Sequence, residues 1–156
     1  MQRELKYIVV DDEELALLNI EAMASSFSFL KKAGVSKNAV EGFDIISNLK
    51  PDIVFADIEM PGINGIEMVK ALAGLAPAPV FITSHPEFAL EGYELHVFDY
   101  LLKPVSEERF EKCVLRLKDF FDMRHNAYAF EQNQELNSII IKQGHDKYKL
   151  DRKSVV

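Results

Sequence analysis

Residues 51–62 read PDIVFADIEMPG, and this stretch decides the fold. Pro51 ends a preceding helical pattern, and the apolar run over 53–56 is typical of a buried strand. Asp57 closes that strand, and the turn-forming residues 60–65 follow it. In open α/β sheets, ligands bind outside the carboxyl ends of the strands. An acidic side chain at such an end is therefore a candidate functional group.

The same feature recurs at other strand ends. Four of the five strand-like runs end in a charged or hydroxyl residue; these residues are Asp11 with Asp12, Asp57, Thr83 and Lys103. Short apolar runs alternate with helical patterns, which favours an α/β protein with a mainly parallel sheet. We expect a flavodoxin-like, doubly wound, five-stranded parallel sheet of order 2-1-3-4-5, with helices on both faces. Strands one and three are then neighbours, so Asp11, Asp12 and Asp57 meet.

Hydrophobic periodicity and capping residues locate the other elements. We expect strands near 6–10, 29–35 and 97–101, the second at the sheet edge because it carries two lysines. Helices are expected at about 14–25, from the cap Asn38 to 49, around 66–72, at 86–95 and after the cap Ser106. The apolar stripes of the first two helices are predicted to be Leu15, Leu18, Ala22 and Met23, then Val40, Phe43, Ile46 and Leu49.

Composition narrows the class of protein. The 156 residues carry a formal net charge of −7, so this chain alone is not expected to bind nucleic acid nonspecifically. The single cysteine, Cys113, cannot form an intramolecular disulfide and suits a reducing compartment. No apolar run approaches the roughly 18 residues of a membrane span, and no signal peptide precedes the first strand. We therefore expect a cytoplasmic protein that has no membrane contact.

Taken together, the residues at the strand ends suggest metal binding and phosphoryl transfer. At about 4 Å and an effective dielectric near 20, each pair of carboxylates repels by on the order of 4 kcal/mol. A hard cation such as Mg²⁺, which prefers oxygen ligands, removes that repulsion. Asp57 could then act as a nucleophile toward phosphorus, because carboxylates form acyl phosphates. Thr83 and Lys103 would stabilise the charge of the new phosphoryl group.

These motifs, in this order, resemble the receiver domain of two-component response regulators. The matching segments are IVVDDE at 8–13, PDIVFADIEMPG at 51–62, Thr83, and DYLLKP at 99–104. The resemblance covers about residues 4–122. It implies a protein that takes a phosphoryl group from a sensor histidine kinase and is not an enzyme acting on other substrates.

The resemblance assigns a role to each matching residue. Asp57 corresponds to the phosphoacceptor, Asp12 to a direct ligand of Mg²⁺, and Asp11 to an outer acid that acts partly through water. Glu59 would offer its backbone carbonyl to the metal.

Three further residues would respond to phosphorylation of Asp57 and transmit its effect. Thr83 corresponds to the switch hydroxyl, Tyr100 to the switch aromatic residue, and Lys103 to the cation that contacts the phosphoryl group. A cis peptide bond is implied before Pro104. On phosphorylation Thr83 would move toward the phosphoryl oxygens and Tyr100 would enter the vacated space. The face formed by helix four, strand five and helix five would change and control homodimerisation.

The C-terminal part of the chain suggests an output domain. We expect a receiver domain over 1–124, an irregular linker over 125–137, and over 138–156 the partial start of a LytTR-type DNA-binding domain. The last expectation depends on two strand-like runs, 138–142 and 148–150, which resemble the beginning of that domain. Binding to DNA would then require a complete output domain that this chain lacks.

Two other functions compete with a signalling receiver. A phosphohydrolase with an aspartyl nucleophile would use an acid two residues after it, where Glu59 lies, but the loops are too short for a substrate-covering cap. A degenerate receiver, acting as an interaction module without phosphorylation, is the other alternative. His85, two residues after Thr83, is interpreted as a loop residue at the rim that could influence the lifetime of an acyl phosphate.

Overall fold

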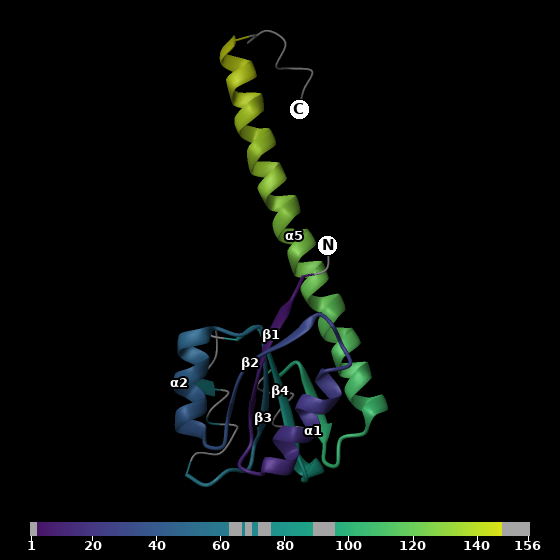
Figure 1. Ribbon diagram of the computed structural model, residues 1–156. Coiled ribbons are helices and arrows are strands. Elements are labelled where there is room, and N and C mark those ends of the chain that lie inside the picture. The colour runs from purple at the N-terminus through teal and green to yellow at the C-terminus, as the bar shows by residue number, and fades with distance from the viewer. Residues whose placement is uncertain (1–2, 63–66, 68–69, 72–75, 89–95, 148–156) are drawn as a thin grey trace. The chain divides into compact units, whose positions relative to one another are not determined.

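The computed structural model describes residues 3–62, 67, 70–71, 76–88 and 96–147 (Figure 1). The chain divides into two compact units, residues 1–114 and 115–156. Its elements in order are β1 (Leu5–Val10), α1 (Glu14–Ala24), β2 (Leu30–Ser36), α2 (Ala39–Leu49), β3 (Ile53–Asp57), β4 (Ala78–Thr83), the 3₁₀ helix η1 (Pro86–Phe88), β5 (Asp99–Leu102) and α5 (Glu107–Lys147).

The first unit is built on one parallel sheet of five strands. The strand order is β2-β1-β3-β4-β5, and all four neighbouring pairs are parallel. This confirms the predicted topology and the edge position of β2. Lys31 and Lys32 of β2 are exposed, and lysines on an edge strand discourage pairing with another chain. Because β1 and β3 are adjacent, their carboxyl ends lie side by side.

One face of the sheet is covered by α2. Ile8 and Val10 of β1, Val54 and Ala56 of β3, and Ala39 and Ile46 of α2 belong to one buried cluster. Gly42 permits the close approach of α2 to β1, since a Cβ there would lie 3.0 Å from two methyl groups of Val10. A larger residue at 42 would push the helix away from the strand.

The opposite face carries α1 and the first turns of α5, and aromatic rings fill it. The Phe55 ring of β3 lies 5.9 Å from that of Tyr7 and 5.5 Å from that of Phe110 in α5. Phe27, in the loop after α1, lies 6.3 Å from Phe110. Such pairs contribute about 0.5–1.5 kcal/mol each beyond the area they bury. They fix the start of α5 against the centre of the sheet.

The buried stripes of α1 and α2 differ from the predicted ones. In α1 the buried residues are Leu17, Ile20 and Ala24, whereas Leu15 and Leu18 are 74% and 52% exposed. The predicted stripe is therefore wrong, and Ala22 is also exposed. The physical reason is that α1 is apolar on more than one side, so two stripes have helical spacing. Packing on the sheet selects between them.

In α2 the predicted apolar stripe is buried only in part. Ile46 is buried and Phe43 half-buried as expected, but Val40 and Leu49 are 64% and 48% exposed. The sheet contacts instead the small residues Ala39 and Gly42, which allow close packing.

The predicted helix caps are confirmed. The side chain of Asn38 accepts a hydrogen bond from the Glu41 amide at 2.8 Å, and Ser106 Oγ accepts one from the Arg109 amide at 3.1 Å. Each cap satisfies a backbone N–H that has no partner within its helix. Residues 67, 70 and 71 of the helix predicted around 66–72 are helical, and the rest of it lies outside the described residues. Most of the helix predicted over 86–95 also lies outside them; η1 covers its start.

The second unit is helical from Leu115 to Lys147. The predicted irregular segment over 125–137 and the predicted strand over 138–142 are therefore wrong as secondary structure. The three isoleucines at 139–141 favour a strand locally, but residues 105–143 contain neither Gly nor Pro. A helix that has already formed can propagate through such a sequence at small cost per residue. The strand predicted over 148–150 lies outside the described residues, and the domain boundaries stay predictions.

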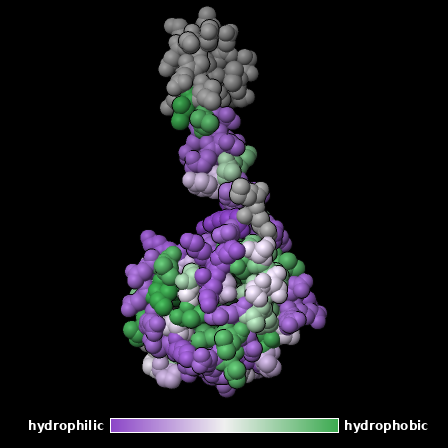
Figure 2. All heavy atoms as spheres, viewed as in Figure 1, coloured by the Kyte–Doolittle hydropathy of each residue, from purple (hydrophilic) through white to green (hydrophobic). Residues whose placement is uncertain are grey.

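The surface of the first unit is mainly polar, with separate apolar patches (Figure 2). The exposed large apolar residues of its helices are Leu15 and Leu18 of α1 and Val40 and Leu49 of α2. Among the described residues, no helix combines the length and the apolar character that crossing a membrane requires.

Replacing Leu17 by Ala should lower the free energy of unfolding by about 2–5 kcal/mol, because Leu17 is 4% exposed and the change leaves a cavity. The matched change Leu15→Ala should alter it by about 0.5 kcal/mol or less. Urea denaturation of both variants measures the difference. Equal losses would contradict the assignment of the buried face of α1.

Candidate functional site

The carboxyl ends of four strands share one local structure. In each, a side-chain oxygen accepts a hydrogen bond from the backbone N–H two residues later; the pairs are Asp11–Glu13 (2.9 Å), Ser36–Asn38 (3.2 Å), Asp57–Glu59 (2.8 Å) and Thr83–His85 (3.1 Å). Asp, Ser and Thr side chains form such turns because their oxygens are short enough to reach the backbone. The turn ends the strand and also fixes the functional oxygen at the rim of the sheet.

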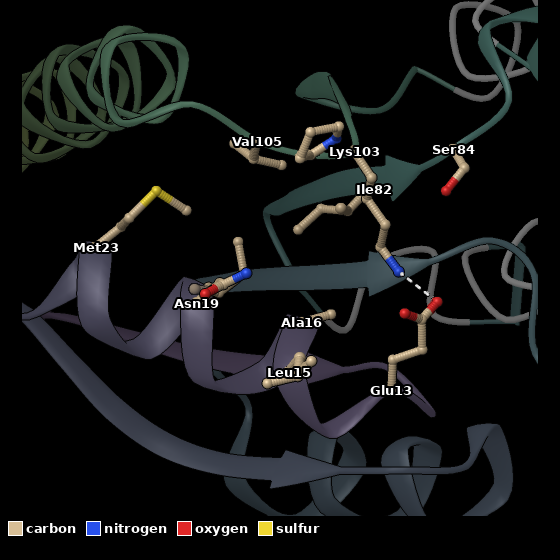
Figure 3. Close-up of a pocket in the computed structure, with 11 residues that line it drawn as sticks. Glu13, Leu15, Ala16, Asn19, Met23, Ile82, Ser84, Lys103 and Val105 are labelled. Carbon is tan, nitrogen blue, oxygen red and sulfur yellow. Dashed lines mark ion pairs between the residues drawn. The ribbon is translucent and has the colours of Figure 1, made fainter.

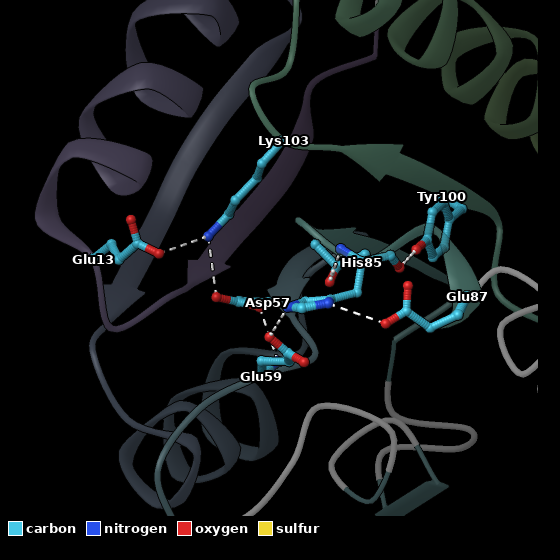
Figure 4. Close-up of polar contacts among 8 residues, drawn as sticks. Glu13, Asp57, Glu59, His85, Glu87, Tyr100 and Lys103 are labelled. Atoms are coloured by element: carbon cyan, nitrogen blue, oxygen red, sulfur yellow. Dashed lines mark hydrogen bonds and ion pairs between the residues drawn. The ribbon is translucent and has the colours of Figure 1, made fainter.

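Lys103 joins two of these aspartates through their other carboxylate oxygens. Its Nζ lies 2.8 Å from Asp11 Oδ2 and 3.1 Å from Asp57 Oδ2, and more distantly 3.5 Å from Glu13 Oε1 (Figure 4). The backbone N–H of Lys103 donates to the Thr83 carbonyl at 2.7 Å, which holds the end of β5 beside β4. The Lys103–Pro104 peptide bond is cis, as the resemblance implies.

The site carries excess negative charge. Carboxylate oxygens of Asp11, Asp12, Glu13 and Asp57 all lie within 4.8 Å of one another. Four carboxylates and the single ammonium of Lys103 leave a formal charge of −3. Asp11 and Asp57 are buried, whereas Asp12 and Glu13 are exposed. A set of oxygen donors that combines strong mutual repulsion with access to solvent can hold a hard divalent cation.

Burial and pairing shift the proton affinities of the two central groups. Burial raises the pKa of the Asp11 carboxyl, although the hydrogen bonds from Lys103 and the Glu13 amide act in the opposite direction. Burial would by itself lower the pKa of the Lys103 ammonium, but hydrogen bonds to Asp11 and Asp57 raise it above its ordinary value. Lys103 therefore stays charged throughout the physiological range of pH.

The structure places the predicted residues together, and it adds groups that the sequence analysis did not assign to the site. Asp11, Asp12, Asp57 and Lys103 meet as the strand order predicts, but Glu13, interpreted from sequence as a first-turn helix charge, belongs to the same cluster. The feature of the sequence that could have placed Glu13 in this cluster is its position directly after the acidic pair at 11–12.

Glu59 and His85 form a side-chain contact that was also not predicted. Glu59 Oε2 lies 2.8 Å from His85 Nε2, and Glu87 Oε1 lies 3.0 Å from the other ring nitrogen (Figure 4). The pair connects the loop after Asp57 with the loop after Thr83. Sequence gives no sign of it, because the two residues lie on separate loops.

The two residues assigned to switching lie next to this pair. Thr83 is completely buried. The half-buried ring of Tyr100 packs against Ile58 and Phe81, and its hydroxyl donates to the His85 carbonyl (Figure 4). Burial raises the pKa of the Tyr100 hydroxyl, and the nearby Glu87 and Glu59 raise it further.

A cavity of about 300 Å³ opens beside the site (Figure 3). Leu15 and Met23 of α1 line one wall, and Ile82 and Val105 line the other. The Glu13–Lys103 ion pair borders the cavity. The cavity therefore joins an apolar surface to the charged cluster.

Comparison with known proteins identifies the family. The model of the response regulator receiver domain matches residues 7–115. The chain belongs to the response regulator receiver domain family. The sheet order and the position of the acidic cluster agree with this membership, and the receiver domain acts in two-component signalling.

Curated relatives of this receiver domain include transcriptional regulators. The chain is 39% identical over 153 residues to the transcriptional regulatory protein BtsR of Escherichia coli strain K12, a match that covers 97% of this chain and 64% of BtsR. It is 41% identical over 114 residues to an uncharacterized response regulatory protein of Vibrio cholerae, covering 72% of this chain and 48% of that protein. The chain thus spans less than two thirds of the length of these relatives.

Solved structures support the fold. The response regulatory domain of protein mrkE from Klebsiella pneumoniae matches with a TM-score of 0.72 and 29% identity, covering 76% of this chain and 99% of that one. The receiver domain of the putative response regulator NarL from Mycobacterium tuberculosis, at 20% identity and a TM-score of 0.68, shares the fold; it covers 75% of this chain and 98% of that one.

Replacing Lys103 by Met should lower the free energy of unfolding of the metal-free receiver by about 3 kcal/mol at pH 7, because two buried carboxylates lose their cation. The pKa of Lys103 is raised, so its stabilising effect persists at every pH below the ordinary lysine range. On the acid side the effect decreases as the Asp11 carboxyl, whose pKa is raised, becomes neutral. Urea denaturation near neutral pH and near about pH 3 should therefore give a much smaller difference at the lower pH. Lys112→Met, at an exposed position of α5, is the control; a loss independent of pH would contradict the assignment.

Proposed function

We propose that this chain is a phosphorylation-activated receiver that accepts a phosphoryl group on Asp57 from a sensor histidine kinase. The supporting observation is the position of Lys103, with Nζ 3.1 Å from one oxygen of the buried Asp57 carboxylate. The other oxygen accepts the Glu59 amide at 2.8 Å. Asp57 is thus oriented by two donors at the mouth of an acidic cluster, which suits a nucleophile that attacks phosphorus.

The proposed step is an in-line transfer. An Asp57 oxygen forms a bond to phosphorus while the bond between phosphorus and the kinase histidine nitrogen breaks, and the bonding electrons stay on that nitrogen. The ammonium of Lys103 is within reach of the phosphoryl oxygens and would offset their added negative charge.

Asp11, Asp12 and Asp57 would hold Mg²⁺ together with a backbone carbonyl from Glu59, as the family resemblance implies. Their oxygen donors and excess negative charge fit this cation. When bound, Mg²⁺ would neutralise the carboxylates and lower the barrier to approach of an anionic phosphoryl group. Glu13 adds a further exposed carboxylate at the edge of the same cluster.

Thr83 and Tyr100 would convert phosphorylation into a conformational change. The hydroxyl of Thr83 accepts the His85 amide at 3.1 Å and would turn toward the phosphoryl oxygens. Because Tyr100 bonds to the carbonyl of the same His85, a movement of that loop changes the environment of Tyr100. The face that includes β5 and the start of α5 would then control homodimerisation.

The output is proposed to be transcriptional. The chain matches 97% of its own length to BtsR, which is named a transcriptional regulatory protein. We infer that the complete protein binds DNA through a LytTR-type domain beyond the receiver, with a boundary near 125–137. The formal charge of −7 makes direct binding of DNA by this part of the chain unfavourable. Action in the cytoplasm follows from this proposal.

Incubation with acetyl phosphate and magnesium should add one phosphoryl group to the wild type and none to Asp57→Ala, because Asp57 is the proposed phosphoacceptor. Intact-protein mass spectrometry measures the adduct, and its loss in mild base is the signature of an acyl phosphate. Asp44→Ala, at an exposed position of α2, is the matched control and should behave like the wild type. A folded wild type without an adduct, tested also with a histidine kinase as donor, would favour a degenerate interaction module.

Beryllium fluoride with magnesium, a stable analogue of the phosphoryl group, should strengthen dimerisation of the wild type and leave Asp57→Ala unchanged. Sedimentation velocity over a range of concentrations measures the shift. The physical reason is that the analogue repositions Thr83 and Tyr100 and so reshapes the face around β5. Identical behaviour of the two proteins would contradict the proposed switch.

A further inference from the structure

The backbone of Tyr100 is held by two charged residues. Asp99 Oδ1 accepts the Tyr100 N–H at 2.7 Å, and Arg109 Nη2 donates to the Tyr100 carbonyl at 3.2 Å. Both peptide groups that flank the Tyr100 side chain are therefore restrained. This arrangement limits rotation of the backbone from which the ring projects.

Asp99 and Arg109 also bind each other through a two-point contact. Arg109 Nη2 lies 2.6 Å from Asp99 Oδ1, and Nη1 lies 3.2 Å from Oδ2. The side chain of Asp99 is only 8% exposed, whereas that of Arg109 is 40% exposed. The hydrogen bond to Asp99 raises the pKa of the guanidinium, so the contact persists at every physiological pH. A planar guanidinium makes this fork, and an ammonium does not.

Polar contacts continue from Tyr100 to the phosphoacceptor. The Tyr100 hydroxyl donates to the His85 carbonyl, and the His85 ring pairs with Glu59. The Glu59 amide in turn donates to Asp57. The fork at the other end reaches the first turn of α5, because Arg109 is the third residue of that helix. A continuous set of hydrogen bonds thus links Asp57 to α5 within the first unit.

We propose that Arg109 is a positioning residue for the switch tyrosine. By binding Asp99 and the Tyr100 carbonyl together, it holds Tyr100 in its half-buried orientation, with the hydroxyl on the His85 carbonyl, and makes the first turn of α5 respond to the state of Asp57. The second part of this inference rests on the proposed function; the first part does not. A purely structural role would instead hold α5 against β5 without affecting the Tyr100 side chain.

The experiment labels the tyrosines of the full chain with 3-fluorotyrosine and follows them by fluorine NMR. Loss of one line in Tyr100→Phe assigns the Tyr100 signal among the five tyrosines. The test variants are Arg109→Ala and Arg109→Lys; the second keeps the charge but not the fork. Lys112→Ala, one turn further along α5 at an exposed position, is the control. Circular dichroism and urea denaturation verify that each variant is folded.

In the resting protein, both Arg109 variants should move the Tyr100 line toward its position in unfolded protein, with the population of the half-buried orientation relative to other orientations reduced about tenfold. Lys112→Ala should leave the line unchanged. With beryllium fluoride and magnesium, the Tyr100 line of the wild type should shift, and the shift should fall about threefold or more in Arg109→Lys. Phosphorylation of Asp57 by acetyl phosphate should stay within about twofold of the wild type.

A Tyr100 line in folded Arg109→Lys that matches the wild type, with and without beryllium fluoride, would overturn the proposal. If Arg109→Ala does not fold, Arg109→Lys decides. If the wild type itself takes no phosphoryl group, the proposed function fails, whereas the resting spectra still test the positioning of Tyr100. If the Arg109 variants change the Tyr100 line of the resting protein but not its shift with beryllium fluoride, Arg109 keeps the positioning role and the coupling to α5 is overturned.

Discussion

Lys103 places one ammonium between the carboxylates of Asp11 and Asp57, and the arrangement of the site depends on this contact. The two carboxylates come from adjacent strands and are almost fully buried. Without a cation between them their repulsion would oppose the packing of β1 beside β3. Removing one partner of such a buried pair costs about 3–5 kcal/mol, so the lysine contributes a large share of the stability of the folded receiver. The same excess of negative charge, next to the ammonium of Lys103, is what the proposed binding of a divalent cation and a phosphoryl group would use.

The turns at the strand ends explain how a stable sheet presents reactive groups. Asp11, Asp57 and Thr83 each use one oxygen to satisfy a backbone N–H two residues later. That bond contributes to folding, and it also orients the side chain before any ligand arrives. For each aspartate the second carboxylate oxygen contacts Lys103. In Asp11 and Asp57, one carboxylate oxygen thus stabilises the fold and the other faces the site, which reduces the conflict between stability and function.

Short polar contacts connect the site to the first turn of α5. The loops that follow β3 and β4 meet at the contact between the Glu59 and His85 side chains, and Tyr100 joins the second of these loops to β5. The fork between Asp99 and Arg109 then extends the connection into α5. Because each contact spans two elements, a displacement at Asp57 has few ways to relax locally.

Sequence alone determined the sheet order, the edge position of β2, both helix caps and the convergence of Asp11, Asp57 and Lys103. These features follow from local patterns, namely apolar runs, turn residues and parallel topology. Only tertiary structure decided which stripe of α1 is buried, because Leu15 and Leu17 have equally suitable spacing until the sheet selects Leu17. It also decided the Glu59–His85 and Asp99–Arg109 pairs, which depend on distances between separate elements. At 138–142, the strand preference of three isoleucines yielded to an uninterrupted helix, since helix propagation is cooperative and extends beyond local propensity.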